Sequence, residues 1–305
     1  MASSYLFDRV YVEVTNVCNL HCAFCTPPSR PLAFMDPDFF AHCLQELQGI
    51  TQQVCLHVLG EPLTHPDFPL LLALCHQAQL AVNLTTNGTL IKKYQDSILQ
   101  AKALRQVNFS LQALDVDTDP DCVILGQIVE FCQLALEKRP ELYINLRLWN
   151  LQSLHRPAAS MQTQVLFNRI AKFLQKPIPP IPQGRKSRCL TGRLYIHQDT
   201  RFAWPTTKEG VRRTRGFCHG LSTHIAILVD GTVCPCCLDA HGELALGNLH
   251  QHSLETILHT PKVMALRQGF AQGKLVADLC QQCTYCHRFP IPRSQKYQGI
   301  SSKTP

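Results

Sequence analysis

Three cysteines stand close together near the start of the chain, at Cys18, Cys22 and Cys25, with three and then two residues between them. One short loop can therefore present three thiolates to a single metal centre, and iron–sulfur clusters are held by thiolates at such spacings. Three thiolates leave one iron of a four-iron cluster open to an external ligand. A zinc site is the alternative for this motif, with His21 available as a fourth ligand.

A second group of cysteines occupies the last third of the chain. A β-hairpin and a cysteine pair that is separated by two residues can supply four thiolates to one centre, which predicts either a second iron–sulfur cluster or a structural zinc site. Spacing alone does not separate these two. The group consists of Cys218, Cys234, Cys236, Cys237, Cys280, Cys283 and Cys286.

Repeated βα units must position these cysteines. Short apolar runs alternate with amphipathic helical stretches from residue 10 to residue 197, which is typical of a parallel sheet with covering helices. Six strand candidates are fewer than the eight of a complete barrel. The expected fold class is therefore α/β, with a partial (β/α)6 barrel followed by a small cysteine-rich domain of hairpin and helix. The strand candidates are residues 10–14, 54–59, 80–86, 106–111, 142–148 and 193–197.

Local signals mark several element boundaries. Asp36 followed by Pro37 predicts the start of a helix. Asp230 and Gly231 stand between two β-prone runs and predict a hairpin turn. Ser253 precedes a short helical stretch. The boundaries of the first helix and of the hairpin are thus expected from sequence alone.

The chain divides by composition into four parts. Residues 1–197 form the expected barrel, 198–217 a connector, 218–290 the cysteine-rich domain, and 291–305 a basic tail that we expect to be flexible. Within the first part, residues 175–190 are rich in proline and basic residues and predict an irregular connection.

The first cysteine loop has an aromatic residue, Phe24, directly before its last cysteine, and Gly60, Glu61 and Pro62 follow the second expected strand. In these motifs the chain resembles the radical S-adenosylmethionine (SAM) superfamily. The resemblance implies that the open iron binds the amino and carboxylate groups of SAM. It also implies that the reduced cluster cleaves SAM to methionine and a 5′-deoxyadenosyl radical, which takes hydrogen from a substrate.

The same resemblance suggests further SAM contacts. Glu61 suits an ammonium group, and Thr86 with Asn87 would lie near SAM. Ser110 and Gln112 would meet the ribose, and Arg147 would pair with the SAM carboxylate. All lie near the carboxyl ends of expected strands, where barrel enzymes gather their active sites. An ordinary turn or packing role for the last three stays open.

The cysteine-rich part resembles the SPASM or shorter twitch extension of radical SAM enzymes, because Gly231, Val233, Pro235 and Cys236 match its hairpin motif. The resemblance implies one auxiliary [4Fe–4S] cluster, since no cysteine follows Cys286. Its implied ligands are Cys218, Cys236, Cys280 and Cys283, with Cys237 or Cys286 as possible substitutes and Cys234 as surplus.

The other cysteines are expected to be structural. Five lie in expected helices or a strand, where cysteine behaves as a small apolar residue. Cys189, in the connection, has no explanation from sequence. The five are Cys43, Cys55, Cys75, Cys122 and Cys132.

The composition of the chain indicates its size class and its cellular compartment. The chain of 305 residues is long enough for a sizeable core, and its 16 cysteines are concentrated at residues 18–25, 218–237 and 280–286, which favours metal binding over disulfides. It begins without a secretory signal pattern and has no long apolar run, so we expect the reducing cytoplasm. The formal charge of +7 is compatible with an anionic substrate or RNA, although a solvated surface explains it as well.

The resemblance does not name a substrate. A fully ligated auxiliary cluster would accept an electron from a substrate radical, giving dehydrogenase-like oxidation of a small molecule. An open iron there would instead allow rearrangement or bond formation. Peptide or protein modification is the second interpretation, and a non-enzymatic iron–sulfur or zinc-stapled RNA-binding protein the third. We expect an electron donor such as flavodoxin or ferredoxin, and no membrane or nucleic-acid partner.

Overall fold

The computed structural model describes most of the chain, and the basic tail expected at 291–305 lies outside the described residues. No helix in the described part is both long and apolar enough to cross a bilayer. The described residues are 6–114, 122–151, 161–178, 181, 185–207 and 212–289.

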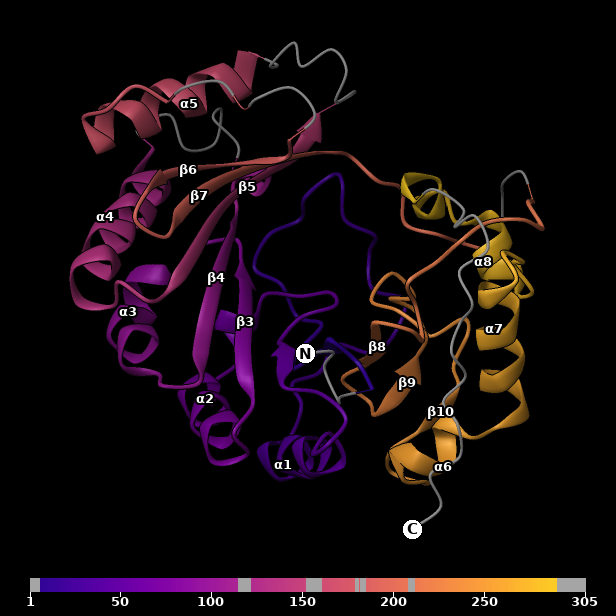
Figure 1. Cartoon of the computed structure of the whole chain (residues 1–305). Coiled ribbons are helices and arrows are strands. Elements are labelled where there is room, and N and C mark those ends of the chain that lie inside the picture. The colour runs from indigo at the N-terminus through magenta and orange to yellow at the C-terminus, as the bar shows by residue number, and fades with distance from the viewer. Residues whose placement is uncertain are drawn as a thin grey trace.

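A single curved sheet organises the described chain, with the strand order β10-β9-β8-β1-β2-β3-β4-β5-β7-β6 (Figure 1). The six strands expected from sequence all form, and they lie side by side in parallel. This confirms the partial barrel. The six are β1 (Arg9–Val12), β2 (Gln53–Cys55), β3 (Ala81–Thr86), β4 (Leu104–Ser110), β5 (Tyr143–Leu151) and β7 (Leu194–Thr200).

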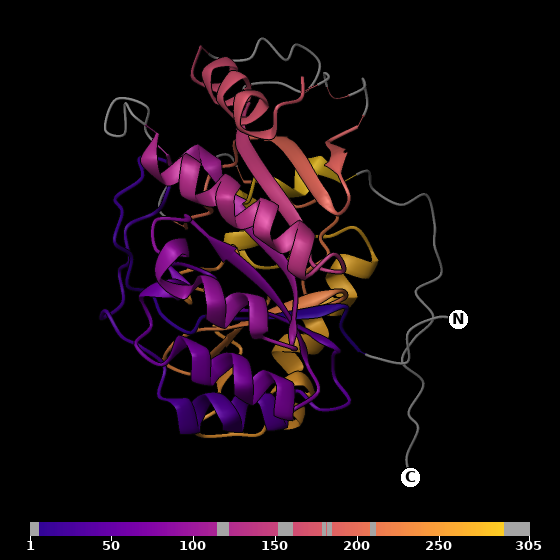
Figure 2. The same ribbon diagram turned by 90° about the vertical axis from the view of Figure 1, so that its left-hand side faces the viewer.

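Helices between successive strands cover the outer face of this sheet, as crossover connections of parallel strands require (Figure 1). Figure 2, viewed from that side, shows α1 to α4 stacked in front of the strands. These helices leave the opposite face of the sheet to the loops at the strand ends and to the C-terminal part. Their bounds are α1 (Pro37–Glu46), α2 (Phe68–Gln77), α3 (Ile91–Gln100), α4 (Val123–Lys138) and α5 (Met161–Leu174).

Helix α1 begins where the sequence predicts. One carboxylate oxygen of Asp36 accepts the backbone N–H groups of Asp38, at 2.9 Å, and Phe39, at 3.1 Å. Pro37 occupies the first turn, where its missing N–H costs nothing. The N-cap and the proline therefore fix the point at which the chain turns from the cysteine loop into the covering helix.

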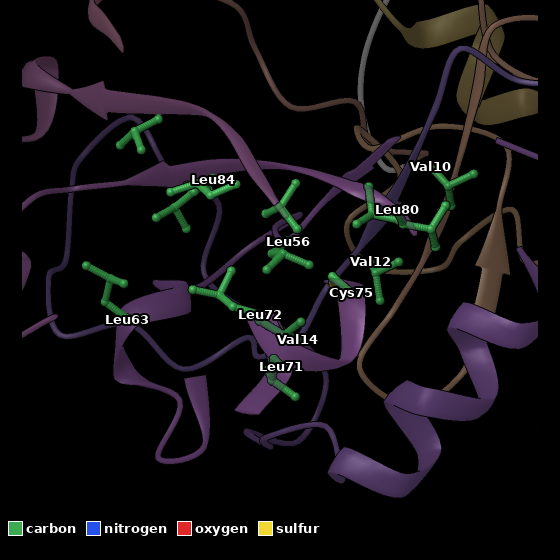
Figure 3. Packing of buried hydrophobic residues seen from close by; sticks show 14 of the residues in the cluster. Val10, Val12, Val14, Leu56, Leu63, Leu71, Leu72, Cys75, Leu80 and Leu84 are labelled. Atoms are coloured by element: carbon green, nitrogen blue, oxygen red, sulfur yellow. The ribbon is translucent and has the colours of Figure 1, made fainter. Parts of the chain in front are cut away.

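Side chains alternate along the parallel strands between an apolar outer face and a polar inner face. Val12 and Leu56 point to the outer face and pack near Cys75 and Leu72 of α2, and Val10 lies beside Leu80 in the same cluster (Figure 3). The positions between them face the inside of the curve, because successive side chains of a strand point to opposite faces. The inner positions include Tyr11, Cys55, His57, Asn83, Thr85, Asn108, Asn145, Arg147 and His197.

The C-terminal part extends the same sheet. β8 pairs in parallel with β1, β9 returns antiparallel to β8, and β10 pairs with β9. Helices α6 to α8 then pack beyond these strands (Figure 1). The bounds are β8 (His224–Ile227), β9 (Thr232–Cys234), β10 (Gly247–Asn248), α6 (Leu254–Leu258), α7 (Pro261–Ala271), α8 (Asp278–Gln282) and the 3-10 helix η3 (Tyr285–Arg288).

The expected hairpin and short helix both form. The N–H of Gly231 donates to the carbonyl of Leu228 at 2.9 Å, and Gly231 has a φ of +81°, which glycine adopts without strain. The Ser253 hydroxyl accepts the N–H of Thr256 at 3.2 Å and caps α6. The cysteine-rich segment is thus positioned by the turn and cap residues that mark it in the sequence.

One expectation about the fold is wrong. The connection predicted to be irregular over residues 175–190 contains the strand β6 (Ser187–Thr191), which runs antiparallel to β7. Its five residues, SRCLT, do not alternate between apolar and polar types, so the sequence shows no strand pattern there. Cys189 lies on this edge, exposed, with its thiol 3.3 Å from the Gly192 carbonyl.

Candidate active site and iron–sulfur sites

The first cysteine loop follows β1 and ends in a tight turn, in which the Cys25 N–H donates to the Cys22 carbonyl at 3.0 Å. Cys18 and Cys25 are exposed and Cys22 is partly buried. A hydrogen bond between the thiols of Cys22 and Cys25 lowers the pKa of Cys22 to about 7. The same hydrogen bond, together with burial, raises the pKa of Cys25, and burial raises the pKa of Cys18. The three thiols thus share one accessible loop.

Glu61 gathers residues from two strand ends beneath this loop. Its carboxylate accepts the Thr86 hydroxyl at 2.7 Å and the backbone N–H of Asn87 at 2.6 Å. The N–H of Leu63, in the 3-10 helix η1 (Pro62–Thr64), is a third donor at 3.1 Å. Glu61 is only 2% exposed, and burial raises the pKa of its carboxyl to about 7. The motifs after β2 and β3 therefore meet at one buried acid.

Asn87 joins this acid to the cysteine loop. Its side-chain amide donates to Asn19 at 2.9 Å, and Asn19 in turn donates to the Thr89 hydroxyl at 2.8 Å. The Asn87 amide also contacts the Cys18 thiol. The structure therefore brings together Cys18, Glu61, Thr86 and Asn87, four residues that the sequence selects separately.

Gly60 allows the loop after β2 to approach the loop after β1. It has a φ of +73°, and a Cβ atom here would lie 2.4 Å from the Thr15 carbonyl and 2.8 Å from the Val17 carbonyl. The N–H of Glu61 donates to that Val17 carbonyl at 2.9 Å. Only glycine fits this contact, which fixes Glu61 relative to Cys18.

Ser110, Gln112 and Arg147 lie farther along the sheet. Ser110 and Arg147 are neighbours in the pairing of β4 and β5. The side-chain oxygen of Gln112, in the 3-10 helix η2 (Leu111–Ala113), is buried and has no hydrogen-bond partner among the described residues. The Arg147 guanidinium lies 4.8 Å from the centre of the Trp149 ring and 3.4 Å from the hydroxyl of Thr85. Among the described residues, no side-chain hydrogen bond or ion pair joins these three directly to Glu61, Thr86 or Asn87.

The C-terminal part holds the cysteine loop from the other side. The indole N–H of Trp204 donates to the Phe24 carbonyl at 3.2 Å, and Arg201 donates to the Ala23 carbonyl at 3.1 Å. His241 contacts the Thr26 hydroxyl at 2.9 Å. The sequence analysis did not select Arg201, Trp204 or His241, because their role depends on contacts between distant segments.

A buried carboxylate connects the two parts. Glu13, directly after β1, accepts the N–H of Leu59 at 3.1 Å and that of Val229 at 3.0 Å. Arg30, after the cysteine loop, donates to the same carboxylate at 2.6 Å and to the Ala240 carbonyl at 3.0 Å. The ends of β1, β2 and β8 therefore converge on one ion pair.

A second site forms where the hairpin meets α8 and η3. The four cysteines implied by the sequence line one small cavity, together with Cys286, and its remaining wall is apolar. The Cys286 thiol donates to the Cys283 carbonyl at 3.1 Å. The cavity is lined by Cys218, Cys236, Cys280, Cys283, Cys286, Pro205, Pro235, Leu275 and Leu279.

These thiols act on one another electrostatically and are held protonated by burial. Burial, and then the charges of Cys283 and Cys286, raise the pKa of Cys218 to about 11. Burial and the neighbouring Cys218 likewise raise the pKa of Cys236 and Cys280. Such buried thiolates need a cationic partner, and iron supplies one. The arrangement fits an iron–sulfur cluster, whose thiolates bind different irons.

Two cysteines of the hairpin point elsewhere. Cys237 lies against Tyr11 and Cys55 on the inner face, and Cys234 lies beside Asp239 in the core. Neither lines the cavity. Throughout the described chain, no three Cys, His, Asp or Glu side chains converge as closely as the ligands of a single metal ion. The sequence could not decide whether Cys236 or Cys237 lines the cavity, because the two cysteines are adjacent and differ only in the direction in which their side chains point.

The cysteines expected to be structural are all buried. Cys43, Cys75, Cys122 and Cys132 belong to the main hydrophobic cluster. Cys55 does not, because it faces the polar inside of the sheet near Tyr11 and Arg147.

Two family models match the chain. The radical SAM superfamily matches residues 12–140, and the iron–sulfur cluster-binding domain named SPASM matches residues 218–287. The first range contains the cysteine loop and the Glu61 group. The second contains all five cysteines of the cavity.

Several curated proteins are similar to part of the chain. An AdoMet-dependent heme synthase of Methanosarcina barkeri is 30% identical over 35% of this chain and 31% of its own length. A GTP 3′,8-cyclase of Microcystis aeruginosa is 30% identical over 36% of each. A PqqA peptide cyclase of Streptomyces rochei is 32% identical over 36% of this chain and 30% of its own length. The chain thus matches about a third of each of these relatives.

Solved structures share the fold over nearly the whole chain. BtrN in complex with AdoMet and 2-DOIA has a TM-score of 0.59 at 18% identity, covering 92% of this chain and 94% of BtrN. Streptococcus suis SuiB has a TM-score of 0.59 at 15% identity, covering 93% of this chain and 74% of SuiB. The family implies a SAM-binding [4Fe–4S] cluster, and the C-terminal domain implies auxiliary iron–sulfur binding. The chain belongs to the radical SAM superfamily and carries a C-terminal SPASM-type domain.

Proposed function

We propose that this protein is an enzyme that cleaves SAM reductively and oxidises a small molecule. When bound, the SAM-ligated cluster supplies a 5′-deoxyadenosyl radical, and an auxiliary cluster offers an acceptor for one electron. Abstraction of a hydrogen atom, followed by loss of one electron and one proton from the substrate radical, gives a net two-electron oxidation. The chain's own residues bind and orient these groups.

One observation carries the proposal: the buried Glu61 carboxylate, held by Thr86 and Asn87, is linked through Asn87 to the Cys18 loop. A buried carboxylate with a raised pKa gains most from a cationic partner. The amino group of SAM is such a partner, and it would sit beside the iron that the three cysteines leave open.

Individual residues then take proposed roles. Cys18, Cys22 and Cys25 hold the catalytic cluster, and Glu61 receives the SAM ammonium. Gly60 and Pro62 shape the loop that presents Glu61. The residues proposed to contact the rest of SAM are Phe24, Thr86, Asn87, Ser110 and Gln112.

For the auxiliary cluster we propose Cys218, Cys236, Cys280 and Cys283 as ligands. Cys286 is the only substitute we retain, because Cys237 faces away from the cavity. Four protein ligands would leave no iron open to substrate, which supports a role in electron acceptance. A fifth thiol in the cavity offers a place for ligand exchange.

We also propose the domain boundaries 1–197, 198–217, 218–290 and 291–305, with the sheet continuous across them through β8. A reducing cytoplasm suits both the free thiols and the clusters. A flavodoxin or ferredoxin is the proposed electron donor.

The test is anaerobic reconstitution, with iron, sulfide and zinc measured per chain beside dithionite-dependent formation of 5′-deoxyadenosine. The proposal expects about eight irons together with SAM cleavage. Cys22→Ala should abolish cleavage and retain the auxiliary irons, whereas Cys189→Ala, at the exposed edge, should change neither. Retained cleavage in Cys22→Ala would contradict the site assignment.

The substrate class is tested with the same preparation. Small alcohols and candidate peptides are added, and deuterium transfer from labelled substrate into 5′-deoxyadenosine is measured by mass spectrometry. Transfer from a small alcohol supports the proposal. Transfer only from a peptide would place the protein among the peptide-modifying enzymes, to two of which the chain is also similar in sequence or fold.

A further inference from the structure

Within the described part of the chain, the inner face of the sheet carries a cation without a counter-ion. Arg147 projects from β5 over the Trp149 ring, and one of its nitrogens lies 3.4 Å from the Thr85 hydroxyl. Among the described residues, no carboxylate lies within ion-pair distance of it. Its electrostatic neighbours are Tyr11, Cys55, Tyr285 and another cation, Arg9.

The acid near Arg147 on the inner face, Asp199, already forms ion pairs with other cations. Asp199, at the end of β7, pairs with Lys186 at 2.8 Å and with Arg288 at 3.3 Å. Two cations therefore share one carboxylate, and Arg147 adds a further positive charge. The described part of this face has an excess of positive charge before any ligand binds.

Neutral polar groups near Arg147 also lack partners. The Nδ1 atom of His57 and the indole N–H of Trp149 are buried and have no hydrogen-bond partner among the described residues. His57 packs edge-on against Tyr11, with ring centres 5.5 Å apart, and Trp149 lies 5.9 Å from His197. Burial and the Arg147 charge lower the pKa of His57 to about 3, so the ring is neutral at pH 7.

Leaving these groups unsatisfied is costly. Burial lowers the pKa of Arg147 only to about 10, so the guanidinium stays charged at pH 7. The guanidinium is partly buried and has no carboxylate partner among the described residues, and the buried, unpaired atoms of His57 and Trp149 each cost free energy. A ligand that brings a negative charge with hydrogen-bonding oxygens would relieve both costs.

We infer that the inner-face cluster of Tyr11, His57, Arg147, Trp149 and His197 binds an oxyanion group, a carboxylate or a phosphate, of the small-molecule substrate. A planar guanidinium binds both oxyanions through two parallel hydrogen bonds. The inference rests on the proposed function, because it assigns this face to the substrate. It assigns Arg147 to the substrate rather than to the SAM carboxylate, because Arg147 shares its face of the sheet with the unpartnered polar atoms of His57 and Trp149.

The test is anaerobic calorimetric titration of the SAM-loaded, reconstituted enzyme with inorganic phosphate and, separately, with acetate, at ionic strength kept constant with chloride. Saturable binding of at least one oxyanion is expected, and the tighter of the two identifies the substrate group. Arg147→Met should weaken that binding about tenfold or more, since a hydrogen-bonded charge is lost. Arg147→Lys keeps the positive charge but cannot donate two parallel hydrogen bonds, so it should show a smaller loss of oxyanion affinity.

Arg105→Met is the matched control, because Arg105 is an exposed arginine of the neighbouring strand β4 and its loss should leave binding unchanged. Iron content and circular dichroism check that each variant is folded. Absence of oxyanion binding, equal binding by Arg147→Met, or displacement of the oxyanion by SAM would each overturn the inference. If Arg147-dependent binding persists in a preparation that never cleaves SAM, the proposed function fails and the oxyanion site stands.

Discussion

Glu13 and Arg30 form a buried ion pair, with the Arg30 guanidinium nitrogen 2.6 Å from the Glu13 carboxylate; the Glu13 side chain is 0% exposed and the Arg30 side chain 10%. Because Glu13 also accepts N–H groups from Leu59 and Val229, this pair links the cysteine loop to the C-terminal part. The geometry of the candidate active site therefore depends on residues of both family domains.

Glu13→Ala should lower the free energy of unfolding by about 3–5 kcal/mol, because it leaves Arg30 buried without its counter-ion. Denaturant unfolding of the apoprotein measures this loss. The matched control is Glu130→Ala, which removes the exposed pair of Lys92 and Glu130 and should cost below about 1 kcal/mol. Equal losses in the two variants would show that the Glu13 pair does not stabilise the junction.

Gly60→Ala should displace Glu61 from the cysteine loop and abolish SAM cleavage, because the added Cβ would meet the Thr15 and Val17 carbonyls. Gly49→Ala is the control variant, because it introduces backbone strain without the steric clash. Gly49 has a similar φ of +74°, with nothing within 4 Å of an added Cβ, so only a strain of about 1–2 kcal/mol is expected. Thermal unfolding and 5′-deoxyadenosine formation are compared; full activity in Gly60→Ala would refute the close-approach argument.

Glu61 should make the apoprotein less stable as pH rises. Its folded pKa of about 7 lies above the ordinary value of 4.5, so the folded state binds the proton more tightly than the unfolded state does. The associated stability is fully present below about pH 4.5 and is lost as pH rises through 7, by about 3 kcal/mol in total.

Denaturant unfolding between pH 5 and pH 8 checks this slope. Glu61→Gln, which cannot titrate, should flatten it. Glu137→Gln, an exposed residue of α4, should leave it as in the parent protein. An unchanged slope in Glu61→Gln would mean that another group carries the pH dependence.

Adjacent cysteines of the hairpin should behave differently. Cys236→Ser should lose about four irons per chain, the content of one cubane cluster, because Cys236 lines the cavity. Cys237→Ser should keep them, because that thiol faces Tyr11. Iron and sulfide analysis with electron paramagnetic resonance distinguishes the two clusters. Iron loss in Cys237→Ser alone would reverse the proposed ligand set.

Much of the fold follows from local sequence patterns. The six parallel strands, the Asp36 cap and the turn at Gly231 are all predicted, because each depends on residues close together in the chain. The sequence also shows polar residues at alternate positions of the strands, for example Asn145 and Arg147. That these residues form one polar face became evident only when the strands were placed side by side. The strand β6 was missed because its five residues do not alternate between apolar and polar types.

By itself, the sequence determined that the chain resembles radical SAM enzymes with a SPASM-type extension, since the cysteine spacings and the Glu61 motif are local features of the chain. Only the tertiary structure decided which side chains meet. The pairing of β8 with β1 and the contact of Glu13 with Val229 join segments that are far apart in the chain. The structure also decided that Cys236 lines the cavity and that Cys237 does not. Such contacts depend on sheet register and packing, which no local spacing encodes.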